Sequence, residues 1–246
     1  MPLFAIIIPA YNEEAFLSGT IKAAREAMAE VKRNGELIVV DNNSTDSTAA
    51  VASESGADRV VFESHNQIAK ARNAGAAATT AELLVFVDAD TRINSETLEC
   101  ALSQLESGKV AGGGARVEMD QDVSAIVGWL VETWNRTSSF FRYAAGSFFF
   151  CRRDVFEEVG GFDESVYAGE EVWFARRIKK WARGKGMSFI VISDPPIVTS
   201  GRKSDWFSSF DFVRQLAVIF LIPWATRSKR LCSMWYSRPE RSSKHL

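Results

Sequence analysis

The sequence contains few of the residues that build cysteine- or histidine-based sites. Its three cysteines, Cys100, Cys151 and Cys232, lie far apart and form no Cys-x-x-Cys pair. This argues against a structural zinc site or a disulfide scaffold and favours a reducing compartment. His65 and His245 are the only histidines, and neither belongs to a cluster of His, Cys and Asp. A Ser-His-Asp hydrolase or a zinc hydrolase therefore has little support.

The sequence pattern also predicts neither a leader peptide nor a membrane-spanning segment. The N-terminal residues lack a basic leader, a long apolar region and a small-residue cleavage site, so we expect no signal peptide and a cytoplasmic protein. The apolar stretch at residues 216–224 is too short to span a bilayer. No Gly-x-Gly-x-x-Gly follows the first apolar run, which argues against a dinucleotide-binding oxidoreductase.

Charge is unevenly distributed along a chain of otherwise ordinary composition. The 246 residues are 46% hydrophobic and 24% charged, with a net charge of −2, which fits one large domain with no preference for nucleic acid. Residues 202–246 contain nine Lys/Arg and three Asp/Glu, a net charge of +6, so the remainder carries −8. An acidic body with a basic tail is predicted.

Short apolar runs alternate with helical patterns. We predict strands at 3–8, 37–40, 59–62, 83–87, 110–119, 147–151, 188–191 and 197–199, and helices at 13–32, 47–55, 68–80, 95–106, 125–141, 154–159, 170–183 and 211–222. Continuous apolar strands are typical of parallel sheets covered on both sides. The fold class is therefore α/β, a mostly parallel central sheet with helices on both faces.

Acidic residues follow two of these strands, at the sheet edge where α/β proteins bind ligands. Asp88 and Asp90 are two residues apart, and such oxygen ligands suit Mg²⁺ or Mn²⁺ bridging to phosphates. A turn or helix cap explains the same spacing. Asp41 can accept hydrogen bonds from a base or ribose, although residues 44–48 also read as turn and capping chemistry.

Each of three further segments has both a functional and a purely structural interpretation. Arg72 can pair with a phosphate or hold an acidic site residue, or be a solvated helix charge. Glu170 and Glu171 open a helix, where the macrodipole favours them, and either can act as a general base. Arg202 and Lys203 lie in a polar loop that can close over a diphosphate or simply be exposed.

Taken in order, these segments resemble family 2 glycosyltransferases of the GT-A fold. The matching runs are Ile-Ile-Pro-Ala-Tyr-Asn-Glu-Glu at 7–14, Val-Val-Asp-Asn-Asn-Ser at 39–44, Ala-Arg-Asn-Ala-Gly at 71–75, Val-Asp-Ala-Asp-Thr at 87–91, Gly-Gly-Phe-Asp-Glu at 160–164 and Gly-Glu-Glu at 169–171. The ordered set is far more specific than any one member. The resemblance implies a GT-A domain at 1–205, with a nucleotide-sugar half at 1–110 and an acceptor half at 111–205, followed by an apolar helix and basic tail at 206–246.

The resemblance also implies roles for single residues. Pro9, Ala10, Tyr11 and Glu13 would contact the nucleoside, and Asp41 the base. Arg72 would lie near the phosphates or ribose. Asp88 would contact ribose or metal, and Asp90 the metal, Mg²⁺ or Mn²⁺. The family usually has Glu-Asp where this chain has Glu170 and Glu171, so Glu171 is favoured as the base and Glu170 is the second candidate.

The implied reaction is an inverting transfer from a UDP- or GDP-sugar to a hydroxyl acceptor, either a polysaccharide or a lipid-linked acceptor. Two alternatives remain: a non-catalytic nucleotide-sugar-binding scaffold, and a sugar nucleotidyltransferase. The second has little support, because residues 11–14 contain no glycine or basic residue. The apolar, aromatic and basic segment at 206–236 fits peripheral contact with the inner face of a membrane, a helix packed on the core, or a dimer interface.

Overall fold

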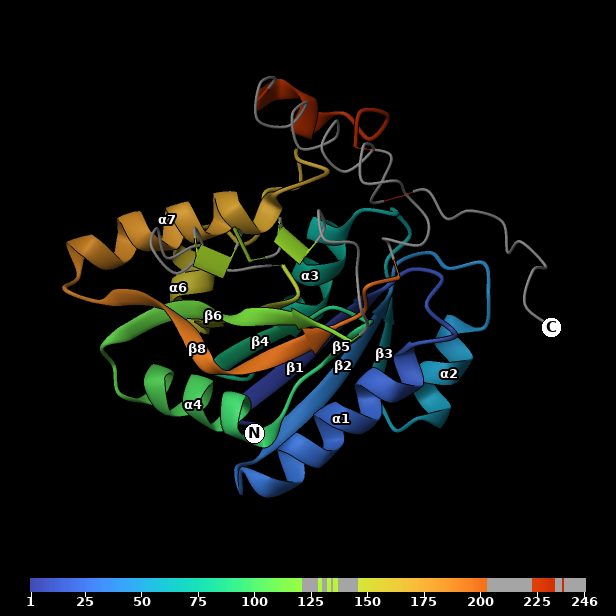
Figure 1. Ribbon diagram of the computed structural model, residues 1–246, viewed down its shortest axis with the longest axis horizontal. Helices are drawn as coiled ribbons and strands as arrows, with labels where there is room; N and C mark the ends of the chain where they lie inside the picture. Colours follow the sequence, from blue (N-terminus) through green and yellow to red (C-terminus); the bar gives the residue numbers. More distant parts are fainter. Residues whose placement is uncertain are drawn as a thin grey trace.

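One eight-stranded sheet organises the part of the chain that this computed structural model describes, residues 1–120, 128–129, 132–133, 135–136, 146–202, 223–232 and 236 (Figure 1). The strand order is β3-β2-β1-β4-β7-β6-β8-β5. The strands are β1 Phe4–Ala10, β2 Gly35–Asp41, β3 Arg59–Phe62, β4 Leu83–Val87, β5 Thr91–Arg92, β6 Val110–Met119, β7 Phe148–Arg152 and β8 Ser188–Thr199. The helices are α1 Leu17–Glu30, α2 Thr48–Glu54, α3 Ile68–Ala77, α4 Ser95–Glu106, α6 Arg153–Glu158 and α7 Glu170–Gly184, with a 3₁₀ helix η1 at Pro223–Arg227.

Parallel pairing dominates the first half of the chain, as predicted. Strands β3, β2, β1 and β4 are all parallel, and β6 and β8 add a fourth parallel pair. Strand β7 runs antiparallel to both β4 and β6 and so joins the two halves of the chain in one sheet. The predicted α/β class is therefore confirmed.

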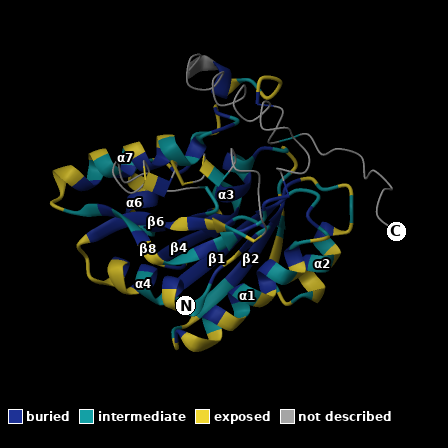
Figure 2. Ribbon diagram, viewed as in Figure 1, coloured by how far each residue is buried: buried dark blue, intermediate teal, exposed yellow. Residues whose placement is uncertain are grey.

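Successive side chains of the buried strands point to opposite faces of the sheet, so each face has its own hydrophobic core. In β1, Phe4, Ile6 and Ile8 face the core beneath α1 and α4, whereas Ala5 and Ile7 face the core beneath α3, α6 and α7. The two helical layers lie on opposite sides of the sheet in Figure 1, and Figure 2 shows the strands buried between them. Because helices cover both faces of these strands, the side chains are mostly apolar until the strands end.

Three predicted elements, two strands and one helix, differ clearly from the structure. The strands predicted at 188–191 and 197–199 are one strand, β8, because the register shifts between Ala115 and Val117 of β6 and leaves Pro195 and Pro196 without ladder partners. The helix predicted to begin at residue 13 begins at Leu17. Asn12 adopts a positive φ of 52°, which a right-handed helix does not contain, and the backbone N–H of Glu13 donates to Thr48 Oγ1 in the turn before α1.

The predictions for residues 125–141 lie mostly outside the described residues, and those for 211–222 lie wholly outside them. Within the part of the chain that the structure describes, no helix combines the length and the apolar character needed to cross a membrane.

Candidate active site

A cavity of about 250 Å³ lies where β1 and β4 end. Its walls come from segments far apart in sequence: the turn after β1, the start of α3, the turn after β4, the first turn of α7 and the loop after β8. The lining residues are Pro9, Ala10, Tyr11, Glu13, Asn42, Asn66, Ile68, Arg72, Asp88, Ala89, Asp90, Gly146, Ser147, Glu170, Glu171, Arg202 and Tyr236. This is the sheet edge at which α/β proteins bind ligands.

Ten of the residues singled out from the sequence line this cavity together, and two do not. Asp41 is buried beside it, where Oδ1 accepts a hydrogen bond from the backbone N–H of Ser44 at 3.0 Å. The neighbouring Asn42 lines the cavity instead. Lys203 lies outside the described residues.

Arg72 is buried, with only 1% of its side chain exposed, and is not the solvated helix charge that remained open from the sequence. Its Nη1 donates to Glu170 Oε1 at 2.6 Å, and its Nη2 donates to Asp88 Oδ1 at 3.0 Å and to the carbonyl oxygen of Gly146 at 2.9 Å. Burial alone would lower the pKa of Arg72, but the charges of Glu170 and Asp88 outweigh it and raise the pKa. Arg72 therefore stays charged and ties α3, β4 and α7 together.

Glu171 lies beside this network without an ion pair to Arg72 among the described contacts. Burial and, to a smaller extent, the negative charge of Glu170 together raise the pKa of its carboxyl group to about 8, against the opposing effect of Arg72. A Cβ atom at Gly146 would lie 3.6 Å from Glu171 Cδ, an ordinary contact distance, so residue 146 lies next to the carboxyl group. A cavity-lining carboxyl with a pKa near neutrality suits proton transfer.

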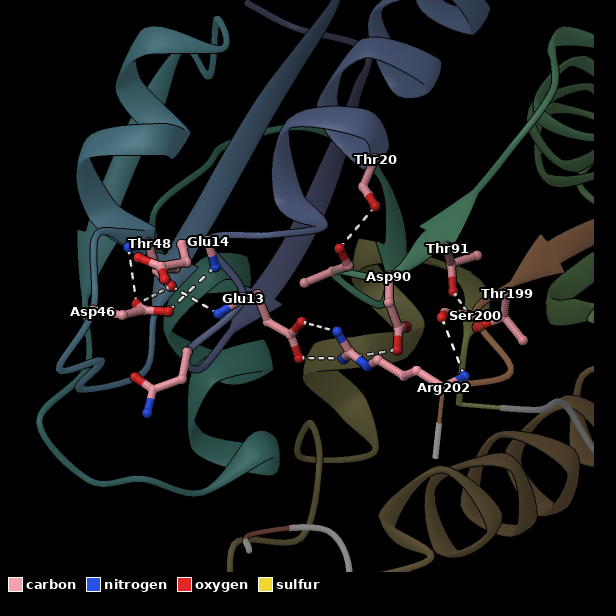
Figure 3. Close-up of polar contacts among 12 residues, drawn as sticks. Glu13, Glu14, Thr20, Asp46, Thr48, Asp90, Thr91, Thr199, Ser200 and Arg202 are labelled. Carbon is pink, nitrogen blue, oxygen red and sulfur yellow. Dashed lines mark hydrogen bonds and ion pairs between the residues drawn. The ribbon is translucent and has the colours of Figure 1, made fainter. Parts of the chain in front are cut away.

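Arg202 joins Glu13 and Asp90 on the other side of the cavity, as Figure 3 shows. Its two terminal nitrogens donate to Glu13 Oε2 and Oε1, each at 2.6 Å, and Nη2 also lies 2.9 Å from Asp90 Oδ2. Burial alone would lower the pKa of Arg202, but the hydrogen bonds to Glu13 and the charge of Asp90 raise it. Glu13 therefore pairs with an arginine while lining the cavity, and its contact with the nucleoside, which the sequence resemblance implied, stays a prediction.

Several lining residues were missed as individual site residues in the sequence. Asn42 and Tyr236 had a signal: the first belongs to a matching run, and the second lies in the aromatic tail segment. Asn66, Gly146 and Ser147 reach the cavity only through the fold. Tyr236 packs edge-on against Tyr167, and burial raises the pKa of its hydroxyl group.

Known proteins of one family share this sequence pattern and fold. The model of a family described as glycosyl transferase family 2 matches residues 5–160. Glycosyltransferase AglE of Haloferax volcanii is 26% identical over 187 residues, covering 72% of this chain and 61% of AglE. This chain thus spans about 60% of the length of that relative.

Solved structures extend the similarity to the fold. The mannosyltransferase PcManGT from Pyrobaculum calidifontis, in complex with GDP-Man and Mn²⁺, has a TM-score of 0.61 at 23% identity, over 81% of this chain and 57% of that one. Glucosyl-3-phosphoglycerate synthase from Mycobacterium tuberculosis, with Mn²⁺, UDP and glucosyl-3-phosphoglycerate, has a TM-score of 0.62 at 17% identity, over 88% and 79%. These similarities confirm the GT-A fold.

Proposed function

The chain belongs to glycosyl transferase family 2, and we propose that it transfers a sugar from a UDP- or GDP-sugar to a hydroxyl acceptor. One observation carries the proposal: a single cavity is lined both by the Asp88 and Asp90 pair and by Glu171. A donor's diphosphate and an acceptor's hydroxyl group would thus meet in one place. The nucleotides in the complexes of PcManGT and glucosyl-3-phosphoglycerate synthase support a nucleoside diphosphate donor.

In the proposed reaction, Glu171 is the general base and the transfer inverts the anomeric centre. The carboxylate accepts the proton of the acceptor hydroxyl, whose oxygen forms a bond to the anomeric carbon while the bond from that carbon to the diphosphate oxygen breaks. The electron pair leaves with the nucleoside diphosphate. Glu170 is held by Arg72 and acts as a positioning residue rather than as the base.

The proposal includes Mg²⁺ or Mn²⁺. Asp88 and Asp90 supply the hard oxygen ligands that these ions prefer, and both line the cavity. No cluster of three or more His, Cys, Asp or Glu side chains suited to a metal occurs in the described ranges, so the donor phosphates would complete the coordination. When bound, the ion would neutralise charge on the diphosphate leaving group.

Peripheral contact with the inner face of a membrane is a second part of the proposal, and it fits a lipid-linked acceptor. The tail segment 206–236 is apolar, aromatic and basic, and its described residues Arg227, Lys229 and Arg230 are exposed. Helix α7 adds exposed Arg176, Lys180 and Arg183 beside the half-exposed ring of Trp173. Basic surfaces with interfacial aromatics bind anionic bilayers.

Thermal-shift measurements with nucleoside diphosphates and nucleotide sugars, with and without Mn²⁺, test the proposal. We expect one nucleotide to raise the melting temperature in a metal-dependent way, since ligand binding stabilises the folded state. Asp90→Ala should abolish the metal dependence. A folded wild-type protein that responds to no nucleotide would overturn the proposal, would also count against a nucleotide-sugar-binding scaffold, and would point to another ligand altogether.

A further inference from the structure

The loop after β8 places Arg202 on the side of the cavity where the metal is proposed to bind. Ser200 donates its backbone N–H to the carbonyl oxygen of Asp90 at 3.1 Å, and Gly201 donates to Asp120 Oδ1 at 3.0 Å. The adjacent residues Thr91 and Thr199 pair through their hydroxyl groups, 3.0 Å apart. The loop is therefore fastened to the segment that carries Asp90, as Figure 3 shows.

The guanidinium group of Arg202 is also confined on its remaining sides. It lies 4.3 Å above the centre of the Phe16 ring, and only 9% of its side chain is exposed. Glu13 takes both terminal nitrogens in a bidentate pair, and Asp90 shares one of them. A buried, doubly paired arginine is ordered before any ligand arrives, because leaving either carboxylate unpaired is costly.

This arrangement places the positive charge of Arg202 next to Asp90, the carboxylate proposed to hold the metal. A divalent cation that approached Asp90 alone would meet the guanidinium group at close range, and repulsion between like charges is strong in a water-poor site. A diphosphate binding with the cation reverses the sign of the effect, because its oxygens attract both the cation and Arg202.

We propose that Arg202 is a resident counter-cation of Asp90 that makes metal binding depend on the donor's diphosphate. This inference rests on the proposed function and adds the order of events. The metal binds weakly to the empty enzyme and tightly with the nucleotide, and Arg202 supplies the difference. Because coupling between two ligands is reciprocal, the metal must strengthen nucleotide binding by the same factor.

Mn²⁺ binding, measured by the electron paramagnetic resonance signal of the free ion, tests this coupling without any turnover. The dissociation constant is determined without nucleotide and with saturating UDP or GDP. Arg202→Gln should bind Mn²⁺ alone on the order of 10-fold more tightly than the wild type, and the further tightening by nucleotide should shrink on the order of 10-fold. Arg202→Lys, which keeps the charge, should retain most of the coupling.

Two controls remove trivial explanations. In Glu13→Gln/Arg202→Gln, no carboxylate is left behind at residue 13 either to destabilise the fold or to act as a new metal ligand, and the loss of coupling should persist. Arg33→Gln removes an arginine that pairs with Glu99 and Glu106 away from the cavity, and it should leave the coupling unchanged.

Unchanged coupling in both Arg202→Gln and the double variant, with nucleotide binding intact, would overturn the role of Arg202 and leave the proposed function standing. If the wild type binds neither UDP nor GDP in the presence of Mn²⁺, the proposed function and this inference fail together.

Discussion

Arg72 and Glu170 form a buried ion pair, 2.6 Å between Nη1 and Oε1, that joins α3 to the first turn of α7. The pair separates the roles of two adjacent glutamates. Glu170 is a fixed counter-ion, and Glu171 is left with a carboxyl group whose charge state responds to pH. Proton transfer therefore belongs to Glu171 in the proposed reaction.

Glu171→Gln should lower kcat on the order of 100-fold or more while leaving the affinity for the donor nucleotide nearly unchanged, because only the base is removed. Glu170→Gln should lower kcat less and should reduce the stability of the fold, since it removes a partner of Arg72. Steady-state kinetics and nucleotide titrations separate the two. Equal losses of kcat in both variants would mean that the base is not Glu171 alone.

The activity should rise with pH as Glu171 loses its proton. Since its pKa is raised to about 8, kcat/KM should approach half of its maximum near pH 8, and Glu171→Gln should lack this rise. A flat profile in the wild type between pH 6 and pH 9, as rough limits of the test, would contradict the assignment.

The stability of the fold should also depend on the charge state of Glu171, but it should fall as pH rises, whereas the activity rises. The raised pKa means that the folded protein holds a proton that the unfolded chain releases above its ordinary pKa of 4.5. The stabilisation is complete below that pH and is lost as pH rises through about 8. Urea unfolding of the wild type and Glu171→Gln should show the variant gaining relative stability as pH increases, and a constant difference would argue against the shift.

Arg72→Met should be strongly destabilising, by about 3–5 kcal/mol, because Glu170 and Asp88 would lose their buried counter-charge. Arg33→Met is the matched control. It also removes an arginine with two carboxylate partners, but Glu99 and Glu106 are about half exposed, and the loss should be below about 1 kcal/mol. Equal losses in urea unfolding would show that Arg72 has no special structural role.

Sequence patterns predicted the parts of this fold that depend on local order. Strands β1, β2 and β4 are unbroken apolar runs, so their positions follow from burial on both faces. The two-residue β5 has no pattern of its own, and β8 continues past two prolines only because β6 shifts its register. The residues of the candidate site likewise divide into those that local patterns predicted and relationships that only the fold shows.

The motifs located the acidic residues and the two arginines of the site, but not which of them pair with one another. Arg202 is 189 residues from Glu13, and Arg72 is 98 residues from Glu170. No local signal in the sequence distinguishes a buried arginine from a solvated one, since burial is decided by which helix packs where. The pairing of Glu13 with Arg202 therefore could be seen only in the fold.

Close approach of α3 to the sheet depends on Gly75. A Cβ atom there would lie 2.3 Å from Ile7 Cγ2, so Gly75→Ala should cost about 1–3 kcal/mol through overpacking. Gly184 ends α7 with no atom within 4 Å of such a Cβ, and Gly184→Ala should change stability by less than about 1 kcal/mol. Thermal unfolding of both variants checks the contrast, and an equal effect would mean that α3 moves away freely.

The exposed basic residues of α7 should matter for binding to anionic vesicles. Between residues 172 and 187 the chain has six Lys/Arg and no Asp/Glu, and Lys180 and Arg183 are exposed. Each basic residue near an anionic surface contributes about 1 kcal/mol, so Lys180→Glu/Arg183→Glu should weaken co-sedimentation with phosphatidylglycerol vesicles at least about 10-fold.

The control for that experiment makes the same change in charge on the opposite side of the sheet. Lys22 lies on α1 and Lys32 follows its end, both exposed, and α1 covers the face away from α7 (Figure 1). Lys22→Glu/Lys32→Glu should leave vesicle binding nearly intact if α7 docks on the bilayer. Equal losses in both double variants would mean that vesicles sense only the net charge, whereas loss confined to the α7 variant would place Glu171 at the end of a helix lying along the membrane surface.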